Sequence, residues 1–97
     1  MKKASDFKNE HIDLQSVFWA LSHASRRKII TNLGKNPKGQ NGKEIASQLS
    51  CAWPTTTRHL IVLKNAGLVS MKKDGREKIY FLRRARLSDA LQWLSKL

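Results

Sequence analysis

Apolar residues along this chain fall into short periodic segments, and their spacing predicts the secondary structure. Near the start, Leu14, Val17, Phe18 and Leu21 stand at i, i+3, i+4 and i+7. This is the spacing of one helix face, so a helix is expected over about residues 12–23. Similar spacing predicts helices over about 26–35, capped by Ser25, and over about 43–49 and 84–96. The residues expected to face inward are Ile29, Ile30 and Leu33, and then Ile45, Ala46 and Leu49. In the last helix, Leu87, Leu91 and Leu94 form one apolar stripe, flanked by Ala90 and Trp93.

The most informative segment covers residues 51–67 and reads C-A-W-P-T-T-T-R-H-L-I-V-L-K-N-A-G. Pro54 suits the first turn of a helix, and Gly67 suits the position just past its end. A helix over 53–66 is therefore expected. Its apolar stripe contains Leu60, Leu63 and Ala66, with Ile61 and Val62 widening it. The hydrogen-bonding residues of its first two turns lie largely off that stripe: Thr55, Thr57, Arg58 and His59.

After residue 67 the pattern takes the period of β-strands. Leu68, Val69 and Met71 begin one strand, and residues 78–82 form a second run rich in β-formers. Residues 72–77 form the turn between them, and their Asp-Gly pair is a strong hairpin signal. Residues 36–42 read as a loop. The 43–49 and 53–66 helices, joined by a short turn, form a helix-turn-helix, and the hairpin over about 70–79 is its wing. The predicted fold is mainly α with a small β-hairpin (α+β), a winged helix-turn-helix in the order α-α-α-α-β-β-α.

Charge narrows the range of partners. The 97 residues include 19 Lys and Arg against 7 Asp and Glu, a formal net charge of +12. This excess indicates a polyanionic partner such as DNA, RNA or an anionic membrane. No apolar run is long enough to span a membrane, and no secretory signal follows the basic start. A single cysteine cannot form an internal disulfide, which suits the cytoplasm. We expect one domain over residues 12–97, with dimerisation helices at both ends, after a flexible basic N-terminus over 1–11.

The polar front of the 53–66 helix is suited to a DNA major groove. The forked guanidinium of Arg58 can match O6 and N7 of guanine, and Thr55 and Thr57 can bond base edges or pack on a thymine methyl. The alternative is that this polar face of the helix is simply exposed to solvent. Arg26 and Arg27 oppose the dipole of their own helix, so either a nearby phosphate or a solvated face accounts for them. The predicted DNA contacts are Trp53, Thr55, Thr57, Arg58, His59 and Lys64, the wing residues Lys72, Lys73, Arg76 and Lys78, and Arg26 and Arg27.

The first and last helices carry more apolar surface than one small core can cover. A second copy of the chain would bury the excess. Trp19 is expected at this contact, although it could instead lie half-buried at the edge of the monomer core. The predicted dimer interface contains Leu14, Phe18, Trp19, Leu87, Leu91, Trp93 and Leu94.

Other chemistry has little support. No Ser-His-Asp set, carboxylate pair or Gly-rich phosphate loop appears, so the chain is not read as an enzyme, and no cofactor is expected. His11, His23 and His59 are too scattered to form a metal-ligand set. Cys51 reads as a small buried hydrophobe; a redox role would need a thiol from elsewhere. Trp53 either contacts the sugar-phosphate backbone or packs onto the third helix. The alternative function is a winged helix that binds protein or RNA without reading DNA sequence.

Two stretches, A-L-S-H-A-S-R-R-K-I-I (20–30) and L-S-C-A-W-P-T-T-T-R-H-L-I-V-L-K-N-A-G-L-V (49–69), carry a family resemblance. Together with the wing K-D-G-R-E-K-I-Y-F-L (73–82), they resemble the arsenic-repressor (ArsR) family of bacterial winged-helix repressors. The resemblance covers about residues 14–94. It implies a homodimer paired through the first and last helices, and operator binding relieved by an effector, whose identity here is unknown.

The chain also departs from that family pattern. Where many members carry a metal-binding Cys-x-Cys pair in the third helix, it has Asn41 and Lys43. The last helix, which holds a second type of metal site in other members, offers Asp89 without a histidine. No metal site is therefore expected. Ala52 replaces the serine that usually caps the recognition helix, and Thr56 stands where a buried valine is common. Its methyl can pack inward while its hydroxyl bonds back along the helix.

Overall fold

The structure is a computed structural model that describes residues 14–97. The predicted flexible N-terminus, residues 1–11, lies outside the described residues. The described part of the first helix covers residues 14–21. There follow α2 (Ala24–Gly34), β1 (Gln40–Asn41), α3 (Gly42–Leu49), α4 (Trp53–Asn65), β2 (Val69–Asp74), β3 (Glu77–Leu82) and α5 (Ala85–Ser95). The predicted winged helix-turn-helix is confirmed, with one strand more than expected.

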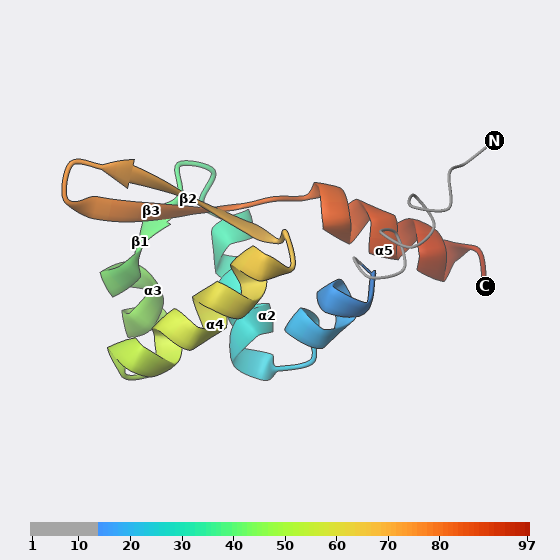
Figure 1. Cartoon of the computed structure of the whole chain (residues 1–97), viewed down its shortest axis with the longest axis horizontal. Coiled ribbons are helices and arrows are strands. Elements are labelled where there is room, and N and C mark those ends of the chain that lie inside the picture. The colour runs from blue at the N-terminus through green and yellow to red at the C-terminus, as the bar shows by residue number, and fades with distance from the viewer. Residues whose placement is uncertain (1–13) are drawn as a thin grey trace.

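The elements are arranged in an elongated body of 45 × 27 × 23 Å (Figure 1). The β2–β3 hairpin projects at one end, close to α3. The first helix and α5 occupy the opposite end, while α2 and α4 lie between the two ends. The helix-turn-helix and wing are therefore separated in space from the helices predicted to pair.

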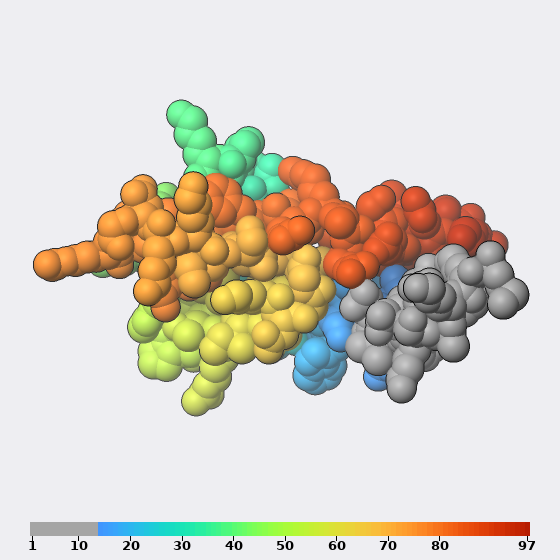
Figure 2. All heavy atoms as spheres, turned by 45° about the horizontal axis from the view of Figure 1, so that its top comes forward, coloured from blue at the N-terminus to red at the C-terminus, as the bar shows by residue number. Residues whose placement is uncertain are grey.

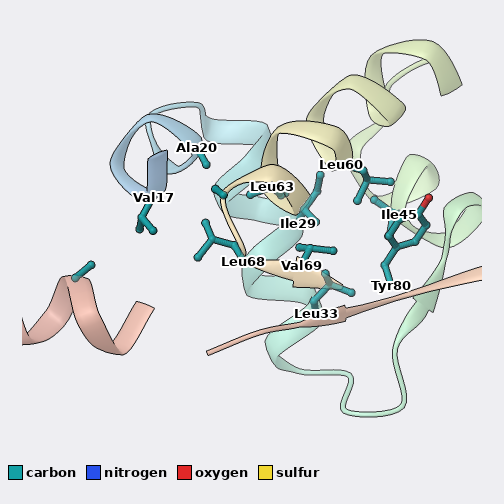
Figure 3. Packing of buried hydrophobic residues seen from close by; sticks show 12 residues of the cluster. Val17, Ala20, Ile29, Leu33, Ile45, Leu60, Leu63, Leu68, Val69 and Tyr80 are labelled. Atoms are coloured by element: carbon teal, nitrogen blue, oxygen red, sulfur yellow. The ribbon is translucent and has the colours of Figure 1, made fainter. Parts of the chain in front are cut away.

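The core lies where α2, α4 and the sheet meet, because each of the three contacts the other two. Leu60 and Leu63 of α4 lie in one buried cluster with Ile29 and Leu33 of α2 and with Val69 of β2 (Figure 3). The first helix extends this cluster through Val17 and Ala20, and α5 adds Ala90. The predicted inward positions Ile29, Leu33 and Ile45 are thus confirmed, whereas Leu91 and Leu94 of the stripe on α5 are exposed.

The sheet has three antiparallel strands in the order β1-β3-β2. Residues 36–42 were predicted as a loop, but Gln40 and Asn41 pair with Tyr80 and Ile79 of β3. A two-residue strand is too short to leave a periodic signal in the sequence. The hairpin turn is also tighter than the predicted 72–77, because β2 and β3 continue to Asp74 and from Glu77. Gly75 has a φ of 64° and Arg76 has no positive φ, which fits a type II′ turn.

Helix ends differ from expectation in their caps. The predicted cap of α2, Ser25, lies inside the helix, and His23 is the true N-cap: its Nδ1 accepts a hydrogen bond from the Ser25 backbone N–H at 3.1 Å. In α3, Asn41 and Glu44 form a reciprocal capping box. The N-cap of α4 is Ala52, which offers no side-chain acceptor. As predicted, the hydroxyl of Thr56 donates back to the carbonyl of Ala52, at 3.2 Å.

Arg26 and His59, both predicted to contact DNA, are instead buried, with exposed fractions of 7% and 8%. The Arg26 side chain donates to the carbonyls of Ala20 (2.7 Å) and Trp19 (3.2 Å), at the end of the first helix. Its Nη1 lies 3.4 Å from Nδ1 of His59. These carbonyls explain the cations in the first turn of α2, so the prediction of a phosphate there was wrong for Arg26.

Arg27 completes this arrangement from the surface. It is exposed, and its Nη1 donates to the carbonyl of Leu21 at 2.7 Å. Two arginines at the start of α2 therefore satisfy carbonyls at the end of the preceding helix, where positive charge is favourable. Whether Arg27 also contacts DNA stays a prediction.

The missing cap of α4 leads to a stability prediction. Ala52 already has the extended backbone of an N-cap, with φ of −63° and ψ of 152°. We expect Ala52→Ser to raise the free energy of unfolding by about 1 kcal/mol, because the hydroxyl can accept a hydrogen bond from a free N–H of the first turn. Urea denaturation measures the change. Ala52→Val is the control without an acceptor, and an equal gain from valine would contradict the capping explanation.

The buried histidine leads to a pH prediction. Burial, followed by the charges of His23 and Arg26, lowers the pKa of His59 below its ordinary value. The unfolded chain then binds more protons than the folded one, so the stability contribution is full above about pH 6.5 and is lost as pH falls towards the folded-state pKa. The contact with Arg26 acts in the same direction, because a guanidinium can only donate and needs an unprotonated Nδ1.

We therefore expect the melting temperature of the protein to fall between pH 7.5 and pH 5 by more than that of His59→Asn. His23→Asn keeps a good N-cap residue and removes one neighbouring charge, so it should show an intermediate fall. Thermal melts followed by circular dichroism measure all three. If the protein and His59→Asn lose stability in parallel, His59 is not the responsible group.

Candidate nucleic-acid interface

The outward face of α4 is centred on Arg58. The buried residues of this helix are Thr56, His59, Leu60 and Leu63. At about 100° per residue, the line opposite to them contains Pro54, Arg58, Ile61 and Asn65, all of which are exposed. Thr55 is also exposed and flanks Arg58. The helix therefore presents a guanidinium with short side chains around it.

Ile61 lies on the opposite face of α4 from the one predicted for it. It was expected to widen the inward stripe, but its side chain is 52% exposed and stands opposite the core. Val62 is partly buried and packs on the core, as expected. Apolar identity alone suggested an inward position for Ile61, whereas the angle around the helix, read from its buried neighbours, shows the outward one.

Two predicted DNA contacts of this region, Thr57 and His59, are less accessible than expected, and Cys51 is partly buried. Thr57 is half-buried, and its shielded hydroxyl has no hydrogen-bond partner among the described residues, so it does not present that oxygen to a base edge. His59 faces the core rather than a groove. Cys51 is partly buried, and its thiol lies 3.5 Å from the carbonyl of Leu49.

Trp53 packs back onto α3, one of the two positions expected for it. Its indole lies so close to Gly42 that an added Cβ there would overlap the ring. Half of the Trp53 side chain stays exposed. It forms one wall of a cleft of about 640 Å³ between α3 and the hairpin, with Lys43, Arg76 and Lys78 among the lining residues. The cations of this cleft lie beside the first turn of α4.

The hairpin turns part of its positive charge towards the same side. Lys73 and Lys78 are directly opposite each other across the two strands. By alternation they share the sheet face of Val69 and Tyr80, which is buried against the helices. Lys72 lies on the opposite face. Like charges opposite each other weaken a hairpin, so Lys73 and Lys78 favour an anion between or beside them.

Few acids among residues 14–97 offset this charge. Glu44 belongs to the capping box of α3, and Asp89 is paired with Arg86 at 3.0 Å on the distant α5. Asp74 and Glu77 face each other near the hairpin tip. Lys64 is exposed in the last turn of α4. The side of the molecule formed by α4 (yellow) and the projecting hairpin (orange) is visible in Figure 2.

The opposite end of the molecule is apolar. Phe18 and Trp93 bring the first helix and α5 together, with ring centroids 5.7 Å apart in an edge-to-face arrangement. Leu14 and Leu87 are partly buried and packed on the core. Trp19 is 66% exposed and Leu91 67%, which is more than expected for a residue at the edge of the monomer core. Leu94 is exposed on the same helix.

The described part of the chain contains neither a metal-ligand cluster nor a membrane-spanning helix. Within residues 14–97, no three His, Cys, Asp or Glu side chains come close enough together to hold a metal ion. Asn41, at one position of the Cys-x-Cys motif, serves as a helix cap instead. No helix in this part of the chain has the length and apolar character needed to cross a bilayer.

Comparison with known proteins agrees with this geometry. Transcriptional repressor SdpR of Bacillus subtilis (strain 168) is 31% identical over 83 residues, which cover 84% of this chain and 88% of that protein. An ArsR-like transcriptional regulator from Rhodococcus sp. RHA1 has a solved structure that is 34% identical, with a TM-score of 0.78 over 89% of this chain and 79% of that one. No family model matches the chain.

A solution structure from Mycobacterium bovis shows the same fold at 24% identity. It is a homodimeric winged helix-turn-helix DNA-binding domain, with a TM-score of 0.74 over 99% of this chain and 90% of that one. The fold, the exposed helix-turn-helix and the identity to SdpR over most of both chains agree with the signature in the sequence. They also favour a regulator over an enzyme. This chain belongs to the ArsR family of winged helix-turn-helix transcriptional regulators.

Proposed function

We propose that this protein is a homodimeric repressor that binds a pseudo-palindromic operator, reading bases through α4 and holding the backbone with its wing. The observation that carries this proposal is the outward face of α4. Arg58 stands on it, exposed, between Thr55 and Ile61, while Lys73 and Lys78 approach from the hairpin side. An exposed hydrogen-bonding helix face flanked by cations suits the major groove of duplex DNA.

The geometry favours duplex DNA over RNA. An α-helix fits the major groove of B-DNA, whereas the major groove of A-form RNA is too deep and narrow for it. The cleft between α3 and the wing supports a backbone contact beside the groove. Its cations, Lys43, Arg76 and Lys78, suit phosphate, and the exposed part of Trp53 suits a deoxyribose. The alternative function is a winged helix that binds protein or RNA without reading DNA sequence. It assigns no base contact to the exposed Arg58.

The apolar end supports pairing with a second copy. Phe18, Trp19, Leu91, Trp93 and Leu94 are exposed large hydrophobics on two adjacent helices, and a patch of this kind marks an interaction surface. The relatives include a homodimeric domain. Two-fold pairing through this end would carry both α4 helices outward, into successive major grooves about 34 Å apart.

The first prediction separates base reading from backbone holding. Arg58→Ala should cost about 1–3 kcal/mol of operator affinity and relax the sequence choice at one base position, because a bidentate contact to guanine is lost. Lys73→Ala combined with Arg76→Ala should weaken binding to all duplexes alike and reduce the salt dependence, because phosphate contacts release counterions.

Titrations of both variants at several salt concentrations, on an operator selected from random duplexes and on scrambled DNA, measure these effects. Lys38→Ala is the control, since this exposed cation lies in the loop before β1, outside the cleft. Equal losses for Arg58→Ala on operator and scrambled DNA would contradict base reading.

The second prediction concerns the dimer. Leu91→Glu places a charge in the apolar patch and should shift the protein towards monomer, with at least a tenfold loss of operator affinity. The control Gln92→Glu adds the same charge to an exposed position on the polar side of α5. Analytical ultracentrifugation and operator titration measure the two effects. If Leu91→Glu sediments like the unchanged protein, the dimer surface lies elsewhere.

A further inference from the structure

Ile61 lies on the outward face of α4, next to Arg58, without any packing reason to be there. It is 52% exposed and follows Arg58 by three residues, so the two side chains are neighbours on the helix surface. The residues that face the core lie on the other side of the helix, as shown by Leu60 and Leu63 (Figure 3). Ile61 therefore contributes little to the folded monomer.

The other exposed large hydrophobics of the described chain are explained by their location. All except one lie on the first helix, on α5 or just after α5, at the end proposed for pairing. The exception is Trp53, which packs over Gly42. Ile61 shares neither location. A β-branched residue also has a lower helix propensity than the long polar residues usual on such a surface. What Ile61 contacts must be sought outside the monomer.

The chemistry of the major groove offers one matching group. Hydrogen-bond donors and acceptors line the base edges, and the apolar exception is the C5-methyl group of thymine. Neighbouring side chains on a helix have Cβ atoms about 5–6 Å apart, and base pairs are stacked about 3.4 Å apart. A side chain next to Arg58 thus reaches a base pair one or two steps from the one that Arg58 contacts.

We propose that Ile61 is a specificity-determining residue that reads a thymine methyl in the operator, within two base pairs of the base contacted by Arg58. This inference rests on the proposed function, because it assumes that α4 lies in the major groove. It adds a requirement on the ligand: each half-site contains a thymine at a fixed distance from the Arg58 position, recognised through its methyl group rather than through hydrogen bonds.

Replacing thymine by deoxyuridine tests this requirement directly. The replacement removes one methyl group and leaves the hydrogen-bonding groups of the base unchanged. Operator duplexes are selected from a random pool, and each thymine of a half-site is then replaced in turn. At one position, binding of the unchanged protein should weaken by about fourfold, the value of one buried methyl group. Ile61→Ala should weaken binding to the thymine operator and bind both duplexes equally at that position.

Two further variants sharpen the test. Ile61→Val keeps part of the apolar surface and should retain part of the discrimination between thymine and deoxyuridine. Lys38→Ala truncates an exposed side chain in the loop before β1, away from α4 and from the pairing end, and should leave the discrimination unchanged. Because Ile61 is exposed, Ile61→Ala should melt at or above the temperature of the unchanged protein, which excludes unfolding as the cause of any loss.

The outcomes separate this inference from the function on which it rests. If the unchanged protein and Ile61→Ala respond alike to deoxyuridine at every thymine, or if neither responds, Ile61 reads no methyl group, although operator binding stands. If the selection yields no preferred sequence and scrambled duplexes bind equally well, the proposed function fails instead. Loss of the response at one thymine in Ile61→Ala alone supports the inference.

Discussion

The burial of a single face of α4 determines what this protein can present to a partner. Leu60 and Leu63 lie in the cluster that contains Ile29 of α2 and Val69 of β2. That packing fixes the rotation of α4 about its own axis. Since successive residues differ by about 100° around a helix, the identity of the outward residues follows from the identity of the buried ones. Arg58 and Ile61 point outward because their neighbours point inward.

The positive charge of the wing lowers the stability of the hairpin in the free protein. Lys73 and Lys78 repel each other across the hairpin, and so do Asp74 and Glu77 at its tip. A hairpin selected only for stability would carry opposite charges at these positions. The register instead places two lysines on the sheet face that turns towards the helices. A polyanion bound on that side removes the repulsion, so its binding stabilises the hairpin.

Much of the fold could be predicted from the sequence because most of its elements have strong local signals. The 53–66 helix carries a proline at its start and a glycine after its end, and the observed helix covers Trp53–Asn65, with Gly67 at a φ of 76° just beyond. The strand β1 could not be predicted in this way. Its two residues are strand only because β3 pairs with them, which is a contact distant in sequence.

The errors at the candidate site have a common physical origin. Residue type alone does not determine whether a side chain is buried, because burial also depends on the groups that can pack against it or bond to it. Arg26 and His59 are polar and were placed at the surface, yet backbone carbonyls and each other's side chains satisfy them inside. Ile61 is apolar and was placed in the core, yet its angular position excludes it. Gly42 and Trp53 show a third case, since only the absence of a Cβ allows the indole to lie where it does.

Arg26 also links α4 to the first helix. Its guanidinium contacts His59 on the reading helix and holds the last carbonyls of the first helix, with the ring of Trp19 centred 5.7 Å away. Trp19 lies on the surface proposed for pairing. One buried side chain therefore connects α4 directly to the helix that carries Trp19. The burial of Arg26, which removes it from the surface, is thus what allows one guanidinium to contact both the first helix and α4.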